Sequence, residues 1–100
     1  MAESRPAISL EYLPVAISGD VELDDQPVRF AFMPDGAGSP GDDDWITAAW
    51  TGDAGMTRTA RLLVGPEGDY VPVPGGVVGW YKVTDDPEIP ARPFGYIRFT

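Results

Sequence analysis

A chain of 100 residues, 43% of them hydrophobic, is long enough for one domain with a packed core and too short to surround a deep catalytic cavity. It contains no cysteine and no histidine, which excludes disulfides, metals bound by either residue, and catalytic triads that depend on a histidine base. The net charge is −9, and eleven of the sixteen acidic residues precede Met56, so nucleic acid is not an expected partner.

The first part of the chain shows the alternation of apolar and other residues that is typical of β-strands. In the segment AISLEYL we expect Ile8, Leu10 and Tyr12 to share the buried face of the first strand. Pro14 follows, and because proline lacks an N–H group, this strand should bend there or lie at a sheet edge.

Two turns are predicted next, GD at residues 19–20 and DDQP at residues 24–27, with a short strand between them. Residues 28–33 (VRFAFM) are the clearest strand of this half. Its apolar face consists of Val28, Phe30 and Phe32.

Residues 34–44 have the composition of a surface loop. Further strands are expected at residues 45–51, 57–65, 77–84 and 94–99. Trp80 and Tyr81 are consecutive, so they must point to opposite faces, and one of them belongs to the core. About seven strands at this spacing predict a single all-β domain, an antiparallel β-sandwich over residues 8–100, preceded by an extended N-terminal arm of residues 1–7.

The core of this sandwich should draw on inward-facing residues of several strands. We expect these side chains to be mostly buried: Phe30, Phe32, Trp50, Leu62, Val64, Val83 and Ile97. No apolar run is long enough to cross a bilayer, and the first residues lack a signal-peptide pattern, so neither a membrane partner nor export is expected.

The run Asp42-Asp43-Asp44 is the most conspicuous acidic cluster. Adjacent aspartates in a glycine-rich loop can supply several oxygen ligands to calcium. The EF-hand order of ligands is missing, however, and no bidentate glutamate follows at the required distance. We therefore expect a solvated loop tip without a bound metal.

A second acidic cluster consists of Asp85, Asp86 and Glu88. Paired carboxylates can hydrolyse glycosides, but only when they flank a sugar-binding cleft. The surrounding sequence TDDPEIP has the chemistry of a turn between two strands, because aspartate bonds to its own backbone and proline fixes φ. We expect a wet connecting loop and no catalytic residues.

The large aromatic residues leave two interpretations open. They can fill the core, or they can form an exposed platform on which sugar rings stack. The candidates for such a platform are Trp45, Trp50, Tyr70, Trp80 and Tyr81. Two or more rings exposed on one face would favour the platform. Lys82, the only lysine, is expected to be a surface residue of its strand and not a nucleophile.

The order of segments in residues 12–98 resembles a known group of proteins. VRFAF is followed by a polar loop, DW…W, ARLLVGP, a glycine turn and VTDDPEIP. This order is similar to that of small immunoglobulin-like proteins encoded among the virion structural genes of tailed phages and prophages of actinobacteria. It is more loosely similar to the immunoglobulin-like N-terminal domain of phage upper baseplate proteins. The resemblance implies an immunoglobulin-like fold and a structural role, and it provides no catalytic residues to transfer.

The expected function is therefore an accessory structural protein of a tailed-phage virion, most simply a decoration protein on the outer head shell. A connector, tail or baseplate module and a carbohydrate-binding module for a host glycan remain alternatives. The expected partners are other virion proteins, such as the major capsid protein or connector and tail proteins, and copies of the chain itself. We expect no enzymatic activity and no cofactor. The expected location is the virion, assembled in the host cytoplasm.

Overall fold

The structure, a computed structural model, describes residues 2–23, 26–84 and 89–100. Its strands are β1 (Ala2–Arg5), β2 (Glu11–Leu23), β3 (Val28–Pro34), β4 (Ile46–Thr47), β5 (Ala49–Thr51), β6 (Gly55–Val64), β7 (Gly75–Val83) and β8 (Ile89–Phe99). A short 3-10 turn, η1 (Asp42–Asp44), lies between β3 and β4.

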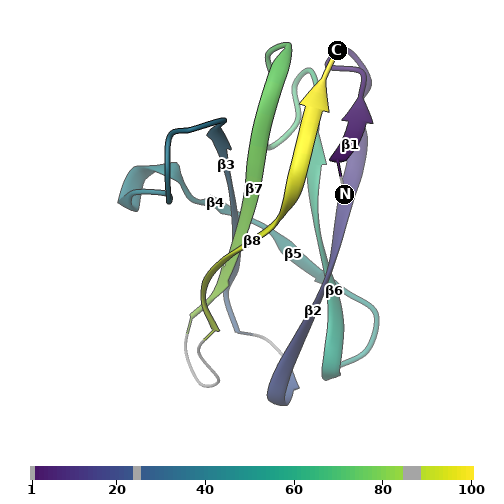
Figure 1. Cartoon of the computed structure of the whole chain (residues 1–100). Helices are drawn as coiled ribbons and strands as arrows, with labels where there is room; N and C mark the ends of the chain where they lie inside the picture. Colours follow the sequence, from purple (N-terminus) through teal and green to yellow (C-terminus); the bar gives the residue numbers. More distant parts are fainter. Residues whose placement is uncertain (1, 24–25, 85–88) are drawn as a thin grey trace.

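The strands form two sheets that pack face to face around one core (Figure 1). One sheet has five strands in the order β1-β8-β7-β3-β4, and the other has three in the order β2-β6-β5. Neighbouring strands are antiparallel, except for β1 and β8, which are parallel. The predicted β-sandwich is confirmed.

Core residues alternate along the strands because successive side chains point to opposite faces of a sheet. Among the residues expected in the core, the buried ones are Phe30, Phe32, Leu62, Val64, Val83 and Ile97. Trp50 packs against the core but keeps an intermediate exposure, so it is less completely buried than the other six. Trp50 lies on the edge strand β5 and its indole N–H donates a hydrogen bond to the carbonyl of Gln26 at 2.7 Å, which holds the polar side of the ring at the rim.

The first long strand buries a different face from the one predicted. Ile8 is 85% exposed and Leu10 is 52% exposed, because both precede the start of β2 and lie outside its alternation. Tyr12 is on the outer face and is also exposed. The inward face of β2 consists of Leu13, Val15 and Ile17. Pro14 lies in a strand that pairs on one side only, as its missing N–H predicts.

The turn predicted at residues 19–20 is also wrong. β2 continues as one strand to Leu23, and its pairing with β6 shifts register between Ser18 and Leu23. Such a bulge accommodates extra residues in a strand without ending it. The glycine and aspartate there consequently mark an irregularity within the strand.

Residues 45–51, predicted as one strand, form two short strands in different sheets. β4 pairs with β3, whereas β5 pairs with β6. Between them the N–H of Ala48 donates a hydrogen bond to the carbonyl of Val28 at 2.9 Å. The chain therefore crosses from one sheet to the other at Ala48, which explains why its apolar residues do not alternate strictly.

Residues 2–5, part of the expected N-terminal arm, lie along β8 of their own chain as the edge strand β1. Glu3 is opposite Ile97, and Arg5 is opposite Phe99. Directly opposite residues share a sheet face, and Ile97 and Phe99 belong to the core. The side chains of Glu3 and Arg5 therefore lie on the inner side of the five-stranded sheet, at its rim.

Candidate functional site

The acidic run Asp42–Asp44 forms the η1 turn, and all three residues are exposed. The N–H of Gly41 donates a hydrogen bond to Asp44 Oδ2 at 2.8 Å, so one carboxylate stabilises its own turn. Across the described ranges, no group of three or more acidic side chains is placed to hold a metal ion. The second predicted cluster, Asp85, Asp86 and Glu88, lies outside the described residues.

The aromatic rings do not form the exposed platform that a sugar-binding face requires. Tyr70 stacks on Phe32 with their centroids 4.1 Å apart, and Tyr81 packs against the core. Lys82 lies over the ring of Trp45, with its Nζ 4.4 Å from the centroid. Trp45, Tyr70 and Tyr81 are each at least partly buried, and so is Trp80.

Trp80 and Lys82 lie on the outer face of the five-stranded sheet. Their register partners on β3 are Ala31 and Arg29, so these residues share the face that points away from the core. The indole N–H of Trp80 is buried and has no hydrogen-bond acceptor among the described residues. Lys82 is thus a surface strand residue held against Trp45 by a cation–π contact, as its alternation with Tyr81 predicts.

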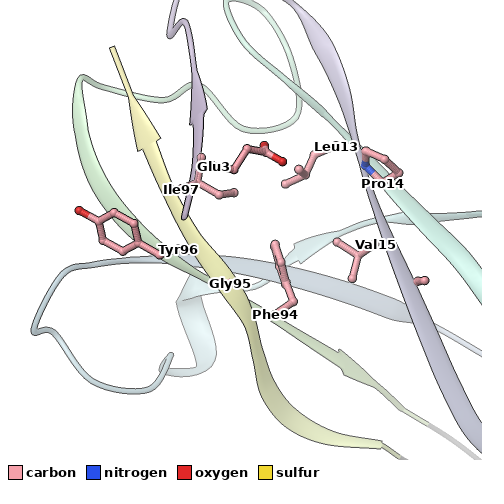
Figure 2. Close-up of a pocket in the computed structure, with 9 residues that line it drawn as sticks. Glu3, Leu13, Pro14, Val15, Phe94, Gly95, Tyr96 and Ile97 are labelled. Atoms are coloured by element: carbon pink, nitrogen blue, oxygen red, sulfur yellow. The ribbon is translucent and has the colours of Figure 1, made fainter. Parts of the chain in front are cut away.

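A cavity of about 310 Å³ opens between the two sheets, where β2 faces β8 (Figure 2). Its lining residues are Glu3, Leu13, Pro14, Val15, Ala16, Phe94, Gly95, Tyr96 and Ile97. Most of them are apolar, and Glu3 from β1 extends its carboxylate towards Leu13 across the opening (Figure 2). We call this cavity, together with the unpaired edge of β2 beside it, the edge groove.

The edge groove exists because the two sheets have unequal numbers of strands. Three strands face five, and β2 is the last strand of the smaller sheet. On the larger sheet β1 pairs only with residues 96–99 of β8. In the described part of the chain, no strand therefore pairs with β8 at Phe94 and Gly95 on the side away from β7. An opening remains between these two edges, with the buried Leu13, Val15 and Ile97 and the partly buried Phe94 along its wall.

Charged side chains lie at one end of the edge groove. Arg5 forms an ion pair with Glu3, and its Nη1 lies 3.6 Å from Glu11 Oε2. The same guanidinium approaches the carbonyl oxygen of Tyr12 at 3.5 Å. Inward-pointing charges of this kind prevent uncontrolled pairing at a sheet edge. Two partly exposed carboxylates share one cation here, which leaves this end of the groove negative.

A second surface feature is the set of exposed apolar residues near the end of the sandwich that carries the C-terminus (Figure 1). Its members are Ile8, Leu10, Tyr12, Val71 and Val73. Ile8 and Leu10 belong to the β1–β2 connection, and both valines belong to the β6–β7 connection. Exposed apolar residues that gather on one region are typical of protein–protein contact surfaces.

Sequence reasoning identified Pro14 as an edge signal but missed Leu13, Val15 and Phe94 as lining residues of a cavity. No motif marks these three residues, because each looks like an ordinary apolar strand position. The cavity arises from the pairing of β2 and β8 with other strands, which the local pattern does not contain.

Burial raises the pKa of the Tyr70 hydroxyl above its ordinary value of 10.0. The unfolded chain then ionises near pH 10, where the folded chain still keeps the proton. The contribution of Tyr70 to the free energy of unfolding should therefore be constant below that pH and should fall as the pH rises above it. Urea unfolding between pH 8 and 11 measures this slope, and Tyr70→Phe should reduce it. An unchanged slope in that variant would assign the effect to other groups.

No protein-family model matches this sequence, no curated protein matches it significantly, and no solved structure matches it significantly. Within residues 2–23, 26–84 and 89–100, the structure has no helix of the length and hydrophobicity that a membrane-spanning segment needs. The function must consequently be inferred from the residues and their arrangement.

Proposed function

We propose that this chain is an accessory structural protein of a tailed-phage virion, a small module that binds other virion proteins. The resemblance of residues 12–98 to immunoglobulin-like virion proteins carries the proposal. The topology supports it, because β2-β6-β5 facing β8-β7-β3-β4 is the order B-E-D facing G-F-C-C′ of an immunoglobulin-like sandwich. The parallel strand β1 extends the second sheet beside β8.

The surface of the module supports a role in protein–protein contact. The exposed apolar residues at one end offer a contact patch, and Val73 there is 72% exposed. In the described part of the chain β2 pairs on one side only, and the stretch of its other edge beyond Pro14 can accept a strand from another chain. Both features suit a protein whose function is to be held in an assembly.

Attachment to the outer head shell is favoured over the connector, tail and baseplate by the distribution of charge. The net charge is −9, and a packaged genome repels an acidic protein. The exposed Asp42–Asp44 turn projects from the body of the sandwich into solvent (Figure 1). An outer position keeps these charges in water and away from nucleic acid.

A glycan-binding module is the main alternative from another functional class. Its supporting observation would be two exposed rings on one face. Tyr70 and Tyr81 pack against the core, and Trp45 is covered by Lys82. No specific observation in the described part of the chain therefore favours that function.

Quantitative mass spectrometry of purified virions tests the proposal through the number of copies per particle. A shell protein should be present in on the order of hundreds of copies, because shell symmetry repeats every contact many times. The number of copies in a single ring would move the protein to the connector or baseplate. Absence from washed particles would contradict the structural role altogether.

A further inference from the structure

We propose that the edge groove docks an extended, basic segment of a partner protein, which adds as a strand to the free edge of β2. This docking surface extends the proposed function. It rests on that function only for the source of the partner, which would be another virion protein.

The backbone of β2 provides hydrogen-bonding groups on the groove side. Pro14 has no N–H, and the Tyr12 carbonyl accepts the Arg5 contacts, so both residues direct their backbone groups away from β6. Backbone direction alternates along a strand that pairs on one side, and the register with β6 is unbroken from Glu11 to Ser18. Ala16 and Ser18 therefore point their N–H and C=O groups to the free edge.

Arg5 and Pro14 block the part of this edge nearest the start of β2. The stretch that can pair with an added strand therefore begins at Ala16. Arg5 already covers the Tyr12 carbonyl, and Pro14 offers no donor. On the side away from β6, the described part of the chain places no strand beside Ala16, whose side chain is exposed. An incoming strand would satisfy these groups with main-chain hydrogen bonds, as in β-augmentation.

The cavity fits the side chains of such a strand. Alternate residues of a strand point to the same face, so the added segment would direct every second side chain between the sheets. Those side chains would meet Leu13, Val15 and Phe94, in a space of about 310 Å³. Phe94 also contacts Phe30, with ring centroids 5.5 Å apart, so the floor of the groove is part of the core.

The acidic side chains near the edge groove favour a basic segment as the added strand. The side chains of Glu3 and Glu11 are 47% and 57% exposed, and both share Arg5. A lysine or arginine on the incoming strand would neutralise the surplus carboxylate, and the net charge of −9 would attract a basic segment over a longer distance. A second copy is disfavoured, because sixteen acidic residues against seven basic ones make copies repel.

Peptide titration followed by heteronuclear NMR tests the groove on the full chain. The probe is a capped hexapeptide of alternating lysine and valine, and the matched control alternates glutamate and valine. The lysine peptide should shift the amide signals of Ala16, Ser18 and the β8 residues that line the cavity. The glutamate peptide should shift them weakly or not at all, and added salt should weaken the lysine peptide's binding.

Substitutions at one position separate strand addition from simple charge attraction. Ala16→Pro removes the free N–H and should raise the Kd of the lysine peptide about tenfold, the effect of one lost hydrogen bond. Ala16→Thr keeps that N–H and favours a strand, so its Kd should stay near that of the parent. Glu11→Lys should weaken binding of the lysine peptide by about threefold or more and improve binding of the glutamate peptide.

Each variant is first checked for a dispersed NMR spectrum, so that loss of folding is not mistaken for loss of binding. Equal shifts from both peptides, or shifts away from β2 and β8, would overturn the proposal. So would the absence of shifts at millimolar peptide. Signals that move with protein concentration alone would instead assign the groove to a second copy. The copy number in virions is measured separately, so the docking surface and the virion role can fail independently.

Discussion

Replacing Phe30 by alanine should lower the free energy of unfolding by about 3–5 kcal/mol, the usual range for deletion of a buried aromatic ring. Phe30 is fully buried in the middle of β3. Its ring contacts Phe94, which lines the edge groove. The surrounding side chains therefore cannot fill the space left by the missing ring without displacing Phe94. Equilibrium unfolding in urea, followed by tryptophan fluorescence, measures the loss.

Trp50→Ala is the matched comparison, since Trp50 is larger but only partly buried. Its removal loses some packing and the hydrogen bond to the Gln26 carbonyl, yet leaves no enclosed cavity. The loss should be smaller than for Phe30→Ala. An equal or larger loss would show that β5 is more central to the core than its edge position indicates. A total stability of about 5–15 kcal/mol for a domain of this kind makes both effects measurable.

Alternation is sufficient to predict the buried face of β3 and of β6. In each strand large apolar residues follow one another at intervals of two on the inner face, and an arginine (Arg29 or Arg61) marks the opposite face. Leu62 and Val64 are buried accordingly. Along β2 the same rule selects the wrong face, because two alternating apolar series follow one another and lie on opposite faces of the strand. One series begins at Ile8 and the other at Leu13, and only pairing with β6 decides between them.

The sheet to which a strand belongs is harder to predict than the strand itself. Ala48 is the crossing point between the sheets because its N–H bonds to the carbonyl of Val28, a residue far away in the sequence. A glycine and an aspartate at residues 19–20 look like a turn, yet β2 absorbs them in a bulge. In both places long-range pairing overrides the local preference.

The edge groove, like the assignment of strands to sheets, could be predicted only in part from the local sequence. Pro14 correctly predicts an edge strand. Which apolar residues line the opening depends on β1 pairing no further along β8 than Tyr96 and, among the described residues, on the absence of a fourth strand beside β2 in the smaller sheet. Neither fact is contained in the local sequence around Leu13 or Phe94. Binding surfaces made by strands that are missing from a sheet are therefore found only once the topology is known.

Gly65 is a glycine at which both the backbone conformation and the surrounding backbone oppose a substitution. It follows β6 directly, is buried and has φ 139°, a backbone conformation that is essentially restricted to glycine. Its N–H donates a hydrogen bond to the carbonyl of Tyr70 at 2.9 Å. A Cβ atom at this position would lie 2.5 Å from the carbonyl oxygen of Ser9 and 2.7 Å from the Cα of Leu10.

Gly65→Ala should consequently destabilise the chain in two ways. Backbone strain alone should lower the free energy of unfolding by about 1–3 kcal/mol, and displacement of the β1–β2 connection, which is backbone and cannot rotate away, should add to it. Gly52→Ala is the control, because Gly52 has φ 72° with no atom within 4 Å of the added Cβ, and should lose only about 1–2 kcal/mol. Urea unfolding of both variants measures the difference. Equal losses would mean that the β1–β2 connection does not pack against Gly65, and the exposed apolar end of the sandwich would then have a different shape.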